Sequence, residues 1–250
     1  MYRALKTSAP VNVRLKLSAI PAFLLVLAAL VWAGGDPWKS KPFQQWDAAD
    51  VKRIVTDSPW ARVIRINAPW KSGQAGDSGS ASGLKHGAGS GSDDDDESSS
   101  PTQAAFLVRW VSSRTVRAAA LRGAVLGGQL KQEEAERELA QPLDVYQVLL
   151  AGPDMKPFDA VDETMLKNNT ELVAKKTKEK IAPAKVQISR SPDGKKIQGI
   201  VFSFPKKSET GESTIAPDEK TVNFSCIAGA AKIEMIFDIS KMQDMQGRDL

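Results

Sequence analysis

Alternating apolar and polar positions are the clearest regularity in the second half of the chain. Between Lys232 and Ser240, Ile233, Met235, Phe237 and Ile239 alternate with mostly charged residues. A period of two predicts a strand with one buried face and one exposed face. Three more β-rich stretches precede this one, and together they predict four closing strands: AKVQISR (184–190), KKIQGIVFSFP (195–205) and TVNFSCIAG (221–229).

Turn residues separate these stretches. Pro192, Asp193 and Gly194 lie between the first two and favour a hairpin, because proline presets one backbone dihedral and glycine accepts a left-handed one. Further upstream, DVYQVLLAG (144–152) predicts a buried strand that ends in a Gly-Pro turn.

Two strands are also expected earlier, at ARVIRIN (61–67) and AAFLVRWVS (104–112). The residues between them, 71–103, are mostly Gly, Ser, Ala and Asp, with a single leucine. Such a composition buries too little apolar surface to offset its ordering entropy, so we expect a disordered insertion between two neighbouring strands.

Three segments show helical periodicity. Asp47 is a candidate N-cap with Asp50 three residues later, and Pro59 disfavours helical geometry just before it, so a helix is expected to end at Asp57 or Ser58. A second helix is expected over 113–141, broken near two adjacent glycines, 127 and 128. The third has one apolar face, formed by Met165, Leu166, Asn169, Leu172 and Val173.

Helices followed by closing hairpins predict an α+β fold, with a mostly antiparallel sheet and two or three helices in a single domain. The expected organisation is a signal peptide over 1–33, then an N-terminal helix and first strand over 34–70. The disordered insertion over 71–103 and the remainder of the α+β domain over 104–250 complete it.

The leader determines the expected compartment. Arg3, Lys6, Arg14 and Lys16 precede an uncharged run from Leu17 to Ala33 that ends in small residues, which is typical of a cleaved export signal. The run is also near the lower length limit of a membrane span, so an uncleaved anchor is the alternative. We expect cleavage after Ala33, no stable membrane anchor afterwards, and a periplasmic or secreted protein.

Cleavage also changes the charge balance. The chain has 34 Lys plus Arg and 30 Asp plus Glu, and four basic residues but no acidic ones precede Gly34, leaving 30 of each. The chain after the leader is therefore formally neutral, which argues against nucleic acid as a partner.

Residue content excludes several catalytic chemistries. The one histidine, His86, lies in the expected insertion, so no histidine-dependent triad can form on a rigid scaffold. One cysteine and one histidine are too few for a zinc or iron site of those ligands, and no Gly-rich phosphate loop is present. We predict no catalytic, cofactor-binding or metal-ligating residues and no cofactor, and Cys226 is expected to be buried.

The remaining chemical signals are weak. Ser82–Lys85 and Ser203–Lys206 have the Ser-x-x-Lys spacing of some acyl-transfer enzymes but lack the helical setting that this chemistry needs. The acidic run Asp93–Glu97 lacks the glycine and ligand spacing of a calcium loop, so we interpret it as a solvated spacer. Carboxylate catalysis needs only two acids, but spacing selects no pair from the available aspartates: Asp47, Asp50, Asp57, Asp144, Asp154, Asp159 and Asp162.

WDAADVKRIVTDSPWA (46–61), FLVRWVSS, FSFPK and the C-terminal IEMIFDISKMQDMQGRDL resemble a group of uncharacterised exported bacterial proteins. The marking stretch has the form W-x(3)-D-x(3)-I-x(3)-SPWA. VYQVLLAGPD, from Val145, is similar to a strand-Gly-Pro-Asp stretch of the GWxTD-domain proteins, although the Gly-Trp-x-Thr-Asp motif is absent here. The resemblance implies export but no known activity, and no functional residues carry over from it.

These observations favour a non-catalytic cell-envelope domain that binds a protein or polymer partner or serves in assembly. Exposed tryptophans are the candidate contacts with the partner. They would come from Trp38, Trp46, Trp60, Trp70 and Trp110. The alternative is a carboxylate-dependent envelope hydrolase, such as a glycoside hydrolase.

Overall fold

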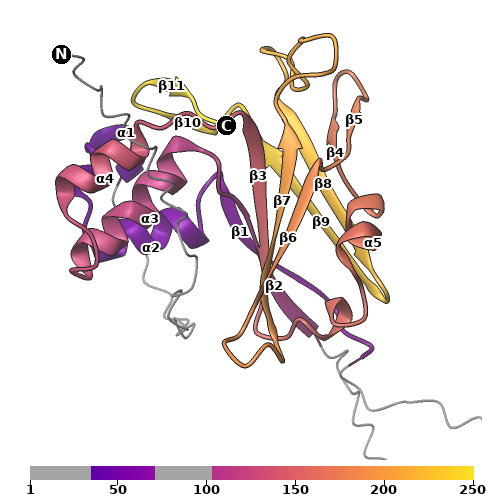
Figure 1. Cartoon of the computed structure of the whole chain (residues 1–250). Coiled ribbons are helices and arrows are strands. Elements are labelled where there is room, and N and C mark those ends of the chain that lie inside the picture. The colour runs from indigo at the N-terminus through magenta and orange to yellow at the C-terminus, as the bar shows by residue number, and fades with distance from the viewer. Residues whose placement is uncertain (1–34, 71–102) are drawn as a thin grey trace, which may run out of the picture. The chain divides into compact units, whose positions relative to one another are not determined.

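The fold was analysed in a computed structural model that describes residues 35–70 and 103–250. Two antiparallel sheets form its centre (Figure 1). The first has five strands in the order β1 (Ala61–Asn67), β2 (Gln103–Trp110), β3 (Val145–Ala151), β7 (Ile197–Pro205) and β6 (Lys185–Arg190). The second has the order β5 (Lys180–Ile181), β4 (Thr170–Ala174), β8 (Thr221–Ala228) and β9 (Ala231–Asp238). A short hairpin, β10 (Gln243–Asp244) with β11 (Gly247–Arg248), stands near the C-terminus.

Alternating side chains of the two sheets meet in a shared core. In β9, Ile233, Met235 and Phe237 are buried while the residues between them are exposed or half-buried, as the alternation predicts. Across the interface, the Trp110 ring meets Phe237 at a centroid distance of 5.0 Å, and Phe202 meets Phe224 at 5.6 Å. Face-to-face packing of this kind closes the core of a β-sandwich.

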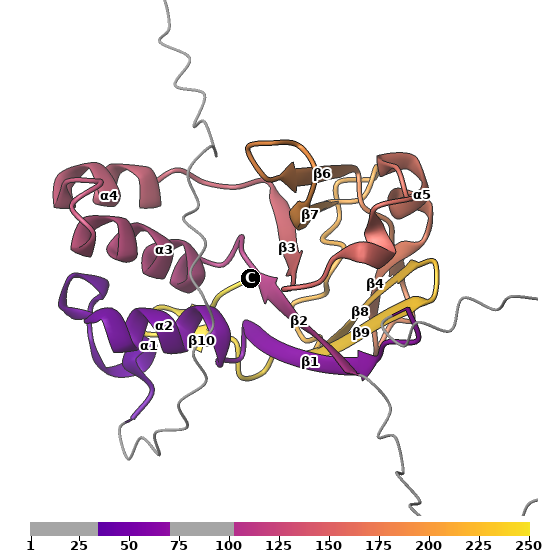
Figure 2. The same ribbon diagram turned by 90° about the horizontal axis from the view of Figure 1, so that it is seen from below.

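Five α-helices are present in the described residues: α1 (Pro37–Ser40), α2 (Ala48–Thr56), α3 (Arg114–Leu126), α4 (Gln132–Leu139) and α5 (Glu163–Asn168). Helices α1 to α4 gather beside β1 and β2, whereas α5 lies at the far side near β6 (Figure 2). Short 3-10 helices occupy Phe43–Gln45 and Lys156–Phe158.

The predicted α+β class and the mostly antiparallel sheet are confirmed. Strand β1 pairs with β2, with Asn67 opposite Gln103, so the segment between them does join neighbouring strands. The break near the paired glycines is also confirmed, since α3 ends at Leu126 and Gly128 has a positive φ of 69°. The leader over 1–33 and most of the insertion, residues 71–102, lie outside the described residues.

The expected helix over Met165 to Val173 is wrong in its second half. Helix α5 ends at Asn168, and the next residues form β4, where Leu172 faces the core opposite Phe224 of β8. Sheet pairing supplies backbone hydrogen bonds and core burial that a short amphipathic pattern does not encode.

Candidate binding surface

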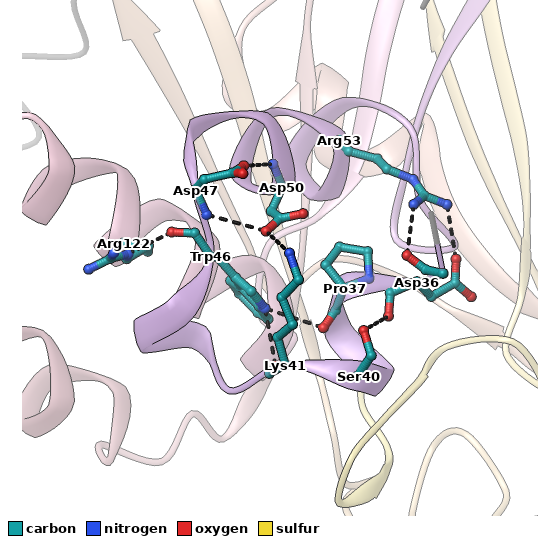
Figure 3. A network of polar contacts seen from close by, with 10 residues as sticks. Asp36, Pro37, Ser40, Lys41, Trp46, Asp47, Asp50, Arg53 and Arg122 are labelled. Carbon is teal, nitrogen blue, oxygen red and sulfur yellow. Dashed lines mark hydrogen bonds and ion pairs between the residues drawn. The ribbon is translucent and has the colours of Figure 1, made fainter. Parts of the chain in front are cut away.

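The conspicuous residues of the first helix form a capping network (Figure 3). The Asp47 carboxylate accepts a hydrogen bond from the Asp50 backbone N–H at 2.8 Å, and the Asp50 carboxylate accepts from the Asp47 backbone N–H at 3.3 Å. The Lys41 ammonium also donates to Asp50 at 2.8 Å. This is a capping box, so Asp47 and Asp50 stabilise the start of α2 rather than offering reactive groups.

Trp46 ties the helices together from inside the same network (Figure 3). Its indole Nε1 donates to the carbonyls of Pro37 and Lys41, at 3.3 and 3.2 Å. Its own carbonyl accepts from the Arg122 Nε at 2.8 Å, which links α3 to the start of α2. The indole and the backbone carbonyl of Trp46 therefore both serve to hold the helices together.

The other tryptophans proposed as contacts are mostly core residues. Trp38, Trp60 and Trp110 are buried, and the rings of Trp38 and Trp60 meet edge to face at 5.5 Å. Trp70 is half-buried and packs against the core. No exposed aromatic platform arises from these residues.

The candidate carboxylates are spread over the fold. Asp57 is the C-cap residue of α2, and Asp162 caps α5 by accepting from the Met165 N–H at 2.7 Å. Asp154 accepts from the Lys156 N–H at 3.2 Å within its loop. Asp144 and Asp159 lie in connecting segments before β3 and after the second 3-10 helix. Among residues 35–70 and 103–250, no cluster of three or more His, Cys, Asp or Glu is placed to hold a metal ion.

Two carboxylates that we did not single out come together at the start of α3. Asp249 is only 8% exposed and accepts from the backbone N–H groups of Arg114, at 2.6 Å, and Thr115, at 2.8 Å. Asp244 pairs with the Arg114 guanidinium and accepts from the Thr115 hydroxyl at 3.4 Å. Burial raises the pKa of Asp249, and the nearby Asp244 charge adds to that effect.

The same C-terminal segment is anchored on the opposite side by Trp60, whose Nε1 donates to the Asp249 carbonyl at 2.8 Å. We call this arrangement of Asp244, Asp249, Arg114, Thr115 and Trp60 the C-terminal clasp. Asp249 uses both carboxylate oxygens on the helix start, so the clasp is structural. Gly247, with a φ of 106°, marks the hairpin in the sequence, but nothing there indicates that the hairpin reaches α3.

The Ser-x-x-Lys pair at the end of β7 does not assemble. The Ser203 hydroxyl accepts from the Gln147 amide at 3.3 Å, while the Lys206 ammonium lies over the Tyr146 ring, 5.3 Å from its centroid. Burial lowers the pKa of Lys206 and raises that of Tyr146, because it disfavours the charged form of each side chain. The other such pair, Ser82–Lys85, lies outside the described residues.

Cys226 is buried as expected. Burial raises the pKa of its thiol to about 11, so the reactive thiolate form is suppressed at neutral pH.

The five-stranded sheet has a second face, turned away from the core. Register places Ala61, Arg109, Leu149, Val201 and Gln187 in one row across its five strands. Ala61 is fully buried, the next three side chains are half-buried and Gln187 is exposed. The solvent exposure of this row therefore increases from β1 toward β6. We call the central part of this surface the outer sheet face: Leu107, Arg109, Gln147, Leu149, Val201 and Ser203.

Arg109 is the anomalous residue of the outer sheet face. Its Nε is buried and has no hydrogen-bond partner among the described residues, and burial lowers the pKa of the guanidinium to about 10. Arg114, by contrast, is paired with the Asp244 carboxylate. A desolvated cation is costly unless a counter-charge compensates it, so Arg109 marks a candidate recognition point.

Comparisons with known proteins give no assignment: no family model, curated protein or solved structure matches this chain. Within the described part of the chain, no helix is long and apolar enough to cross a membrane.

Proposed function

We propose that this chain is an exported cell-envelope domain that binds or helps to assemble a partner, with the outer sheet face as its binding surface. Export is supported by the basic leader and the uncharged run that ends at Ala33. Binding is supported above all by Arg109, whose buried Nε lacks a partner in the part of the domain that the structure describes. The partner is an envelope protein or polymer rather than nucleic acid, because the chain after the leader is formally neutral.

The hydrolase alternative is less well supported. It requires two carboxylates that face each other across a cleft with room for a substrate. Asp244 and Asp249 lie together, but Asp249 is committed to the start of α3 and Asp244 to Arg114. A panel of polysaccharide substrates tests this alternative, and activity lost on replacing one Asp or Glu would favour it over binding.

Export is tested by fractionating cells that produce the untagged protein, detected with an antibody, because a C-terminal tag would disturb the clasp. Mass spectrometry of the exported protein should find an N-terminus at Gly34. A retained Met1 would contradict cleavage, and protein confined to the cytoplasm would contradict export.

Binding is tested by a photo-reactive amino acid placed at Gln187, which is exposed on the same face as Arg109. The matched control carries the same amino acid at Glu234, which is exposed on the other sheet. Illumination of producing cells should give crosslinked products from position 187 and few from position 234. Equal yields at both positions, or none from 187, would count against the outer sheet face as the binding surface.

A further inference from the structure

The chemistry of the partner follows from what the outer sheet face lacks. The strands present three cationic side chains on this side of the sheet, Arg65, Arg109 and Lys185, and among the described strand residues of this face there is no carboxylate. Arg65 and Lys185 are exposed to water, whereas the Arg109 Nε is shielded from water and has no acceptor among residues 35–70 and 103–250. The missing group is therefore an anion that can reach Arg109.

The surroundings of Arg109 are largely apolar. Leu149 is directly opposite Arg109 in the sheet, and Leu107 and Val201 complete a half-buried apolar strip. The Leu149 side chain lies across Gly199, since a Cβ at that glycine would stand 3.2 Å from Leu149 Cδ1. A partner group at Arg109 would thus be surrounded by apolar surface on its β3 and β7 side, where ionic contacts are less screened by water.

A second copy of this chain is a poor occupant. Two identical faces related by two-fold symmetry would bring the same cations toward each other, and the described strand residues of neither face offer a carboxylate between them. Charge complementarity therefore points to a different partner that carries the opposite charge.

Resting on the binding function proposed above, we propose that the outer sheet face docks a partner protein that presents one aspartate or glutamate carboxylate, flanked by apolar side chains, to Arg109. The carboxylate accepts from the guanidinium, and the apolar flanks cover Leu107, Leu149 and Val201. Gln147 and Ser203, already hydrogen-bonded to each other at 3.3 Å, provide polar groups at the border of the strip.

The test uses the full chain with the photo-reactive amino acid at Gln187, combined with Arg109→Met, Arg109→Lys or a control, Arg62→Met. Arg62 is exposed on β1 but lies in register with Val108, so it points away from the outer sheet face. Arg109→Met should lower the yield of the crosslinked protein at least about tenfold, because it removes the buried partner of a charge pair. Arg109→Lys should retain part of the yield, and Arg62→Met should leave it unchanged.

A second arm separates a protein partner from a lipid. Purified protein is heated with and without dodecanoate, an amphiphilic carboxylate. If dodecanoate raises the melting temperature of the wild type but not of Arg109→Met, and no protein is crosslinked, a lipid carboxylate is the occupant and the proposal is overturned. Crosslinking that does not depend on Arg109 would overturn the carboxylate contact while leaving the binding function intact. If position 187 gives no crosslinked protein and dodecanoate does not raise the melting temperature, both the proposal and the outer sheet face as a binding surface are overturned.

Discussion

The carboxylate of Asp249 caps helix α3 by accepting the backbone N–H of Thr115 at 2.8 Å, across a separation of 134 residues. It also accepts the N–H of Arg114, and the Ser113 side chain accepts the N–H of Val116 at 3.2 Å. Three N–H groups that a helix start leaves unpaired are thus satisfied, one by a local cap and two by the C-terminal segment. The last residues of the chain are therefore part of the folded domain.

Removal of this cap should destabilise the domain. Asp249→Ala leaves two N–H groups at a buried helix start without acceptors, so we expect a loss of about 2 kcal/mol in unfolding free energy. That loss corresponds to a melting temperature lower by about 4–8 °C for a domain of this size. Differential scanning calorimetry measures it, with Asp218→Ala as an exposed control that should change little. An unchanged melting temperature for Asp249→Ala would show that the clasp does not hold the tail.

The same carboxylate should give an unusual pH dependence. Burial raises the pKa of Asp249, so the native state binds its proton more tightly than the unfolded state does. The stability that Asp249 contributes is then largest below its unfolded pKa of about 3.9 and declines as pH rises through the raised native value. Subtracting the unfolding free energy of Asp249→Asn from that of the wild type should give a difference that falls as pH rises above about 4. Urea titrations measure it, and a rising difference would contradict the assignment.

Glu219 should show the opposite trend. It lines a surface cleft of about 520 Å³ and is only 4% exposed. Burial acts to raise the pKa of Glu219, but backbone N–H groups, among them Thr221 at 3.1 Å and Lys176 at 2.9 Å, outweigh it and hold the pKa below its usual value. The stability that ionised Glu219 contributes is present above its unfolded pKa and is lost as pH falls through its lower native pKa.

Glu219→Gln should accordingly lower the unfolding free energy at pH 7 by about 1–2 kcal/mol, because charge-assisted hydrogen bonds are replaced by weaker ones. The deficit should shrink below about pH 4, where the glutamate itself becomes protonated. Urea unfolding at pH 7 and at low pH measures it, and Glu212→Gln, which changes an exposed residue, is the control. A deficit that stays constant with pH would argue against a carboxylate whose pKa is lowered in the native state.

Local patterns predicted much of the secondary structure. Alternation in β9 and the cap at Asp47 depend on residues close in sequence, and both are found in the fold. The division into two sheets depends on which strands pair over long separations, as β3 does with β7, and period-two patterns do not encode this choice. Leu172 illustrates the limit, because its spacing from Met165 also fits a helix and only its pairing with β8 places it in a strand.

The roles of Arg109 and Asp249 were not visible in the sequence for the same reason. An arginine at an outward position of a strand, as Arg109 is in AAFLVRWVS, is ordinary. What distinguishes Arg109 is the absence of a carboxylate from the described strand residues of its face, and this emerges only when five strands are aligned. Asp249 likewise gains its role from a contact with a helix that begins 135 residues earlier.

The capping box of α2 gives a local test of the helical layer. Asp47→Ala removes the acceptor for the Asp50 N–H and should cost about 1 kcal/mol of unfolding free energy. Asp47→Asn or Asp47→Ser, which retain a capping acceptor, should recover most of that loss. Urea unfolding of the variants measures the effect, and equal stability of Asp47→Ala and wild type would contradict the cap.

The proposed binding role of Arg109 predicts that this residue lowers the stability of the isolated domain. Among residues 35–70 and 103–250 no counter-charge offsets its desolvated guanidinium, so Arg109→Met should raise the unfolding free energy by about 1–2 kcal/mol while keeping the long side-chain stem. Thermal melts of the purified protein measure this, and Arg62→Met, at an exposed position on β1, should have little effect. A destabilised Arg109→Met would assign Arg109 to the fold instead, because a residue that holds the sheet together weakens it when replaced. A stabilised variant that also loses crosslinking from position 187 would show that the domain gives up stability at this position for the ability to bind.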